Sequence, residues 1–200
     1  EMQDVNSQMI APLSGAKPKM RVIDACAGAG GKTLHLAQIM NNKGKIIALD
    51  TSEKKLEALR QRATRAGATI IETRQITSTK TIKRLKESAD IVLIDAPCTG
   101  LGVLRRNPEA KYNLKPEQVE SLHKQQQDLL VSYSRMTKPN GTLVYSVCSI
   151  LPSEGEKQTR TFTENHPDWI LSFEKRFSPA TDGFDGFYVA LLKRKTGESN

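Results

Sequence analysis

Residues 21–33, RVIDACAGAGGKT, decide the fold of this chain. A short apolar run that ends in one acid, Asp24, leads into a loop of small residues, and a helical pattern begins at Lys32-Thr33. Strand, glycine loop and helix in this order form the nucleotide pocket of α/β sheets. Glycines let the backbone approach a ligand, and the helix N-terminus offers free N–H groups. The stretch therefore predicts a ligand pocket at the end of the first strand.

Three ligands are compatible with this loop. The dinucleotide pattern G-x-G-x-x-G is met except that Thr33 takes the third glycine's place. The phosphate-binding pattern G-x-x-x-x-G-K-[ST] is met except that Cys26 takes the first. The S-adenosylmethionine loop of Rossmann-like methyltransferases, an acid followed by small residues at alternating positions, fits from Asp24 onward with the same cysteine in a glycine position. An ordinary turn is the simplest alternative, so the loop alone does not choose its ligand.

The composition is that of one globular domain spanning residues 1–200. No apolar run is long enough to cross a bilayer. Thirty basic residues against 22 acidic ones give a net charge of +8, which favours a polyanionic partner such as nucleic acid, with a solvated basic surface as the alternative. Because the chain starts at Glu1 rather than Met, we expect a fragment or a processed chain.

The chain holds three cysteines, Cys26, Cys98 and Cys148, and three histidines. The cysteine number is odd, there is no C-x-x-C pair, and no histidine has a metal-like spacing. This argues against a disulfide framework and against a metal site. Free thiols are typical of a reducing compartment, so we expect a cytoplasmic protein.

Apolar strands alternate with helical patterns along most of the chain, which predicts a doubly wound α/β fold. Residues 91–94 are continuously apolar, as in a strand buried on both faces of a parallel sheet. Two strands in succession near the end predict an antiparallel hairpin and thus a mixed sheet. Residues 1–20 read as a polar loop, 139–141 as a turn, and Ser153 with Glu156 as a capping box. The expected strands are 21–24, 45–49, 69–72, 91–94, 142–146, 169–173 and 187–193, and the expected helices lie near 34–40, 53–66, 82–85, 116–136 and 154–165.

Polar side chains follow several of these strands, at the edge where ligands of such sheets bind. Asp50 lies about twenty residues past the glycine loop and suits the two hydroxyls of a ribose, although it also suits the start of the next helix. The strand 91–94 delivers Asp95 and Cys98, and the strand 142–146 delivers Cys148. A buried inert cysteine is the alternative for Cys98. A thiolate beside an acid suits attack on an electron-poor ring carbon such as cytosine carbon 6, after which carbon 5 accepts a methyl group.

Taken together, the motifs resemble the Sun/Fmu-type RNA 5-methylcytosine methyltransferases. The likeness covers nearly the whole domain. Such enzymes have a Rossmann-like S-adenosylmethionine-dependent fold, methylate cytosine carbon 5 of RNA through a covalent cysteine adduct, and usually carry an upstream RNA-binding region, which we expect to be absent from this chain. The motifs are Met2-Gln3-Asp4 with Ser7-Gln8, Asp24–Thr33, Asp95–Gly100, Gly102–Pro108, Tyr145–Leu151 and Asp182–Phe187.

The resemblance assigns roles to individual residues. It implies Cys148 as the nucleophile and Cys98 as an aid to product release; Cys98 as the attacking thiol, as in DNA cytosine methyltransferases, is the alternative. Lys32 and Asp95 complete the implied catalytic set, and Arg105 and Arg106 are candidates for RNA phosphates. The implied S-adenosylmethionine contacts are Ala25, Cys26, Ala27, Gly28, Gly30, Gly31, Lys32, Asp50, Thr77 and Asp95.

Three positions depart from the family pattern. Gly28-Ala29 stand where Ala-Pro is usual, Val147 stands where Thr is usual, and Thr77 stands where an acid is expected after the third strand. The expected partners are S-adenosylmethionine and RNA, ribosomal in preference to transfer RNA, with no metal and no membrane, and we expect a monomer. The alternatives are a P-loop NTPase and a non-catalytic RNA-binding or assembly protein that keeps the fold.

Overall fold

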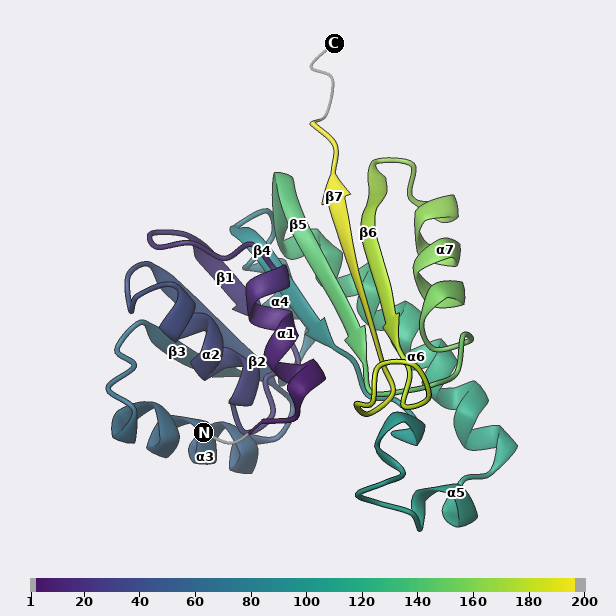
Figure 1. Cartoon of the computed structure of the whole chain (residues 1–200). Helices are drawn as coiled ribbons and strands as arrows, with labels where there is room; N and C mark the ends of the chain where they lie inside the picture. The colour runs from purple at the N-terminus through teal and green to yellow at the C-terminus, as the bar shows by residue number, and fades with distance from the viewer. Residues whose placement is uncertain (1–2, 197–200) are drawn as a thin grey trace.

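The computed structural model describes residues 3–196, with only the backbone at Asn113; the expectations that involve Glu1, Met2 or 197–200 lie outside this range. One seven-stranded sheet runs through the described chain in the order β3-β2-β1-β4-β5-β7-β6 (Figure 1). The strands are β1 (Arg21–Asp24), β2 (Lys45–Asp50), β3 (Ile71–Gln75), β4 (Ala89–Asp95), β5 (Thr137–Val147), β6 (Trp169–Phe177) and β7 (Phe187–Arg194).

Neighbouring strands from β3 to β5 are parallel, and β7 runs antiparallel to both β5 and β6. The carboxyl ends of β1, β2, β4 and β5 therefore meet at one edge of the sheet. This confirms the predicted α/β fold and its antiparallel C-terminal strand.

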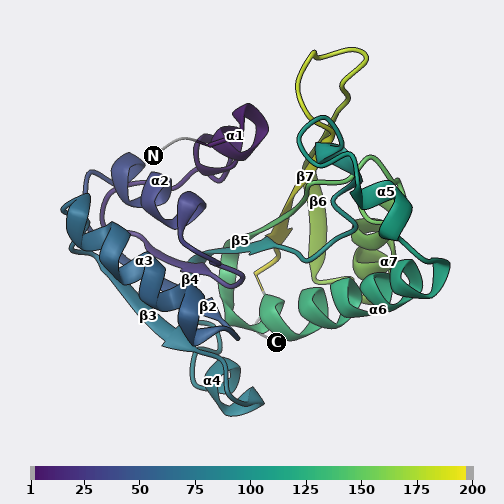
Figure 2. The same cartoon turned by 90° about the horizontal axis from the view of Figure 1, so that it is seen from below.

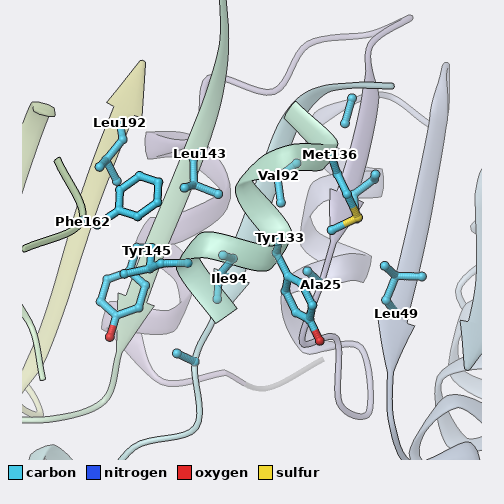
Figure 3. Close-up of a cluster of buried hydrophobic side chains, with 14 of the residues drawn as sticks. Ala25, Leu49, Val92, Ile94, Tyr133, Met136, Leu143, Tyr145, Phe162 and Leu192 are labelled. Carbon is cyan, nitrogen blue, oxygen red and sulfur yellow. The ribbon is translucent and has the colours of Figure 1, made fainter. Parts of the chain in front are cut away.

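Helices cover both faces of the sheet (Figure 2). One core packs helices α1 and α2 on β1, β2 and β4, and a second core on the other face holds side chains of α4, α6 and α7. Figure 3 shows part of the second core, where Tyr145 and Ile94 lie among side chains of α6 and α7. The helices are α1 (Val5–Leu13), α2 (Gly31–Ile39), α3 (Glu53–Arg65), α4 (Thr79–Lys83), α5 (Ala110–Asn113), α6 (Pro116–Tyr133) and α7 (Glu156–Asn165), with short 3-10 turns η1 (Leu101–Val103) and η2 (Ser134–Met136).

The N-terminal segment is helical, so the expectation of a polar loop over residues 1–20 was wrong. Asp4 caps α1 by accepting the N–H of Asn6. The helix buries Ile10 and Ala11 in the core it shares with α2. The N-terminal segment is thereby fixed over the sheet.

Two local expectations also failed. Residues 139–141 belong to β5 rather than to a turn; Asn140 has a φ of 62° and the register against β4 shifts there, so the strand carries a bulge. Ser153 and Glu156 form no capping box, because α7 begins at Glu156 and its N-cap is Gly155; among the described residues no side chain caps this helix, and Glu156 binds Arg176 of β6.

Among the described residues, no helix is both long and apolar enough to cross a membrane, and no group of His, Cys, Asp or Glu could hold a metal ion.

Candidate active site

The glycine loop at the end of β1 needs glycine at two positions. Gly28 and Gly30 have φ values of 54° and 88°, in the region that other residues avoid. A Cβ on Gly30 would lie 2.5 Å from Cγ of Leu59 on α3. The backbone N–H of Gly28 donates to Oδ2 of Asp50 at 2.9 Å, and Ser52 N–H donates to its Oδ1 at 2.8 Å. The carboxylate at the end of β2 is therefore oriented by the loop it faces.

Asp24 ends β1 beneath this loop and is almost completely buried. Its Oδ2 accepts the Thr33 hydroxyl at 2.7 Å, while its Oδ1 has no hydrogen-bond partner in the described part of the chain. Burial raises the pKa of Asp24 to about 6 against the lowering effect of Thr33. A buried carboxylate with one free oxygen is suited to a positively charged ligand group.

A cavity of about 280 Å³ opens at this edge of the sheet. Asp24, Gly31 and Lys32 line it on the glycine-loop side, and Asp95 and Cys148 line it on the side of β4 and β5. The other lining residues come from the N-terminal segment, the glycine loop, the segment after β4, and the start of β7 with the loop before it: Gln3, Asp4, Ser7, Cys26, Ala27, Val103, Arg106, Asp185, Gly186 and Phe187.

Lys32 and Asp95 form an ion pair in the cavity wall. The Lys32 Nζ lies 2.6 Å from Asp95 Oδ2, and the Ser146 hydroxyl donates to Oδ1 at 2.9 Å. Burial alone would lower the pKa of Lys32, but Asp95 outweighs it, so the pKa is raised and the ammonium stays charged. The site thus holds a fixed positive charge beside a fixed carboxylate.

The two cysteines meet at the same edge. The sulfur atoms of Cys98 and Cys148 lie 3.4 Å apart, and both residues are partly buried free thiols. A hydrogen bond to Cys148, together with burial, raises the pKa of Cys98, while the hydrogen bond from Cys98 lowers the pKa of Cys148. Of the two thiols, Cys148 therefore ionises more readily and Cys98 keeps its proton to higher pH.

Three loops cross beside Cys148. The N–H of Gly102 donates to the Cys148 carbonyl at 3.0 Å, and the N–H of Gly186 donates to the Gly102 carbonyl at 2.8 Å. A Cβ on Gly102 would lie 1.8 Å from the Gly186 oxygen, so only glycine permits this crossing. The predicted RNA contacts lie here. Arg106 Nε is 2.7 Å and Arg105 Nε is 3.8 Å from the buried Asp185 carboxylate, although both guanidinium groups remain largely exposed.

The structure brings half of the predicted site residues together in one cavity. Cys26, Ala27, Gly31, Lys32, Asp95, Cys148 and Arg106 share the cavity. Cys98 touches Cys148 but faces a separate groove beside α5 and α6. Ala25 is buried, and Thr77 is exposed just after β3.

Three residues of this edge were missed from the sequence as site residues: Asp24, Asp185 and Glu154. Asp24 was noted as the acid that ends the first strand, and Asp185 lies within the last motif of the resemblance. No local pattern marks Glu154, whose partner Thr99 is 55 residues away.

Comparison with known proteins identifies the family to which the chain belongs. The family model described as 16S rRNA methyltransferase RsmB/F matches residues 12–193. This chain belongs to the RsmB/F family. The match supports S-adenosylmethionine as the ligand of the loop and leaves the dinucleotide and P-loop patterns as partial likenesses.

Individual proteins and solved structures are also similar to this chain over most of its length. The probable ribosomal RNA small subunit methyltransferase B of Bacillus subtilis is 34% identical over 97% of this chain and 47% of its own length. The crystal structure of PH0851 superposes with a TM-score of 0.92 at 34% identity, over 97% of this chain and 47% of that one. NSun6 from Pyrococcus horikoshii, solved with the S-adenosylmethionine analogue SFG, gives 0.87 at 28% identity, over 98% and 53%. The chain spans about half the length of these proteins.

Proposed function

We propose that this chain methylates carbon 5 of cytosine in RNA, with S-adenosylmethionine as the methyl donor and Cys148 as the covalent nucleophile. The observation that carries the proposal is the thiol pair, with Cys148 beside the Lys32–Asp95 ion pair in one cavity. Methylation of a ring nitrogen or an exocyclic amine needs no thiol. The RsmB/F family membership and the +8 charge favour ribosomal RNA as the substrate, and a monomeric cytoplasmic protein stays a prediction.

The glycine-loop side of the cavity fits S-adenosylmethionine. The free oxygen of Asp24 would accept the α-ammonium group, and Asp50, already oriented by Gly28 and Ser52, would accept the ribose hydroxyls. When bound, S-adenosylmethionine supplies a methyl group on a positively charged sulfur.

The other side of the cavity fits a cytosine that has left its stack. Asp95 would bind the ring edge that carries nitrogen 3, and Lys32 would offset the negative charge that develops on the ring. The Cys148 thiolate forms a bond to carbon 6, and the displaced electron pair makes carbon 5 nucleophilic enough to take the methyl group.

Release completes the cycle. Once Cys148 is a neutral thioether, its thiolate no longer raises the pKa of Cys98, so Cys98 gives its proton to water more readily than before. The Cys98 thiolate then removes the carbon 5 proton, the bond between carbon 6 and sulfur breaks, and its electron pair returns to Cys148. One proton reaches the solvent for each methyl group transferred.

Single-turnover reactions with 16S ribosomal RNA and isotope-labelled S-adenosylmethionine test this proposal. We expect Cys148→Ala to abolish methylation and adduct formation, because the nucleophile is lost. Cys98→Ala should accumulate an RNA–protein adduct that survives denaturation, and Cys98→Ala/Cys148→Ala should form none.

Two results would count against the assignment. Methylation by Cys148→Ala would show that Cys148 is not the nucleophile. Tight RNA binding by the wild-type chain without methylation or adduct would support the non-catalytic alternative.

A further inference from the structure

A second buried carboxylate lies behind the cysteines. Glu154 belongs to the turn between Cys148 and α7 and has no exposed surface. Its Oε1 accepts the backbone N–H of Thr99 at 2.9 Å and the Gln126 amide at 3.0 Å, and its Oε2 accepts the Thr99 hydroxyl at 2.6 Å. Three donors therefore satisfy a charge that would otherwise be costly to bury.

These bonds hold both neighbours of Cys98. Thr99 binds Glu154 through its backbone and its side chain, and the Gln126 amide also donates to the Pro97 carbonyl at 2.9 Å. The backbone on either side of Cys98 is thus tied to one buried cluster.

The same carboxylate residue is fixed to the strand that delivers Cys148. The Tyr145 hydroxyl of β5 donates to the Glu154 carbonyl at 2.7 Å. The Thr99 hydroxyl also lies 3.4 Å from the hydroxyl of Ser149, the residue after Cys148. Glu154 therefore bridges the Cys98 loop and the Cys148 turn.

We propose that Glu154 is a positioning residue, which with Thr99 and Gln126 holds the Cys98 sulfur against the Cys148 sulfur. Its role in release rests on the proposed function, but its role in thiol geometry does not. A carboxylate suits this position because all three partners donate. A glutamine here replaces one acceptor oxygen by an NH2 group, so it keeps the Thr99 contact only if the Thr99 hydroxyl turns from donor to acceptor.

The first test measures thiol geometry without RNA or S-adenosylmethionine. The free protein is treated with diamide, a two-electron oxidant of thiol pairs, and Cys98–Cys148 disulfide formation is followed by peptide mass spectrometry. We expect Glu154→Gln and Thr99→Val to form the disulfide about tenfold more slowly than wild type, since displacement by about 1 Å costs up to about 10²-fold between reacting groups.

Two matched variants control for general loosening. Thr99→Ser keeps the hydroxyl and should match wild type. Glu164→Gln makes the same substitution at an exposed position of α7, away from both cysteines, and should also match wild type. Unfolding temperatures by circular dichroism show whether each variant is folded. If Glu154→Gln does not fold, Thr99→Val still tests the proposal.

The second test follows single turnover with RNA. We expect Glu154→Gln and Thr99→Val to raise the ratio of covalent adduct to released product about tenfold, as the Cys98 base moves away, while Thr99→Ser restores it. Unchanged disulfide rates in folded Glu154→Gln and Thr99→Val would overturn the positioning role. If the two variants form the disulfide more slowly but the wild-type protein never methylates RNA, the positioning role is kept and the proposed function is overturned.

Discussion

Two buried carboxylates, Asp24 at the end of β1 and Glu154 in the turn before α7, differ in their hydrogen bonding. Asp24 accepts one hydroxyl, keeps one oxygen free and lines the cavity. Glu154 has three donors and does not line the cavity. On the side that would bind the cofactor, one carboxylate oxygen thus lacks a hydrogen-bond partner, which a ligand could supply. On the side of the thiols, the protein itself supplies every donor to Glu154. A buried oxygen without a hydrogen-bond partner, in a residue that lines the cavity, distinguishes Asp24 from Glu154.

The largest expected effect comes from Asp24→Asn. A pKa raised from 3.8 to about 6 makes the ionised form about 3 kcal/mol less favourable in the folded protein. The folded protein binds this proton more tightly than the unfolded chain, so its stabilising effect is present below pH 4 and is lost as the pH rises through 6. At pH 7.5 the variant should therefore gain up to about 3 kcal/mol of unfolding free energy and bind S-adenosylmethionine more weakly.

Urea unfolding at pH 4.5 and 7.5 and calorimetric titration with S-adenosylmethionine measure the two effects. The gain should shrink at the lower pH, where Asp24 is already protonated. Glu154→Gln provides the contrast, because removal of a satisfied charge should destabilise the protein. Equal signs for the two substitutions would remove the distinction between the carboxylates.

The next effect concerns the thiols. Cys98→Ala removes the hydrogen bond that lowers the pKa of Cys148, so the pKa should rise and thiolate reactivity should appear only at higher pH. Cys98→Ser keeps a donor and should retain a profile close to wild type. The rate of Cys148 alkylation by iodoacetamide, followed by peptide mass spectrometry from pH 6 to 10, gives both profiles. Identical profiles for the alanine and serine variants would mean that Cys98 does not set this pKa.

The smallest effect is expected at Thr77, which stands where the family pattern has an acid. Thr77 is exposed just after β3, next to Ile76, whose N–H donates to the Asp50 carbonyl. Thr77→Asp should add one charged acceptor for the adenosine part and tighten S-adenosylmethionine binding about fivefold, or about 1 kcal/mol. Thr79→Asp, the same substitution at an exposed position two residues away, is the control for added charge. Equal affinities in calorimetric titration would show that residue 77 does not contact the cofactor.

The sequence predicted the parallel half of the sheet well because its strands are buried on both faces and read as apolar runs. Residues 91–94 are the clearest case, and they form the centre of β4. The third strand was predicted at 69–72 but lies at 71–75, because an edge strand with half-buried polar side chains has no such pattern. Helix α1 was missed because its apolar contribution to the core is small and Pro12 interrupts the pattern.

The candidate site also contains residues that a local sequence pattern marks and residues that no such pattern marks. Lys32, Asp95 and Cys148 were found because strand ends and motifs place them in sequence. The Glu154 cluster was not found, since its partners come from three separate parts of the chain and nothing local marks them. Ser153 and Glu156 showed the opposite failure. The local pattern predicted a capping box, but the Glu156 side chain binds Arg176, which is distant in sequence and is brought near by the folded sheet.

The order of strands has a consequence for synthesis on the ribosome. Strand β7, the last strand of the described residues 3–196, lies between β5 and β6, so within this part of the chain β6 joins the sheet only through β7. The Gly186 bond to Gly102, beside Cys148, forms with the same segment. A nascent chain can pair β1, β2, β3 and β4 early, but it completes the thiol side only after Arg194 has been added and has left the exit tunnel. During translation, the side of the sheet that carries the glycine loop therefore forms first. Cys98 and Cys148 gain the contacts from the last strands only at the end.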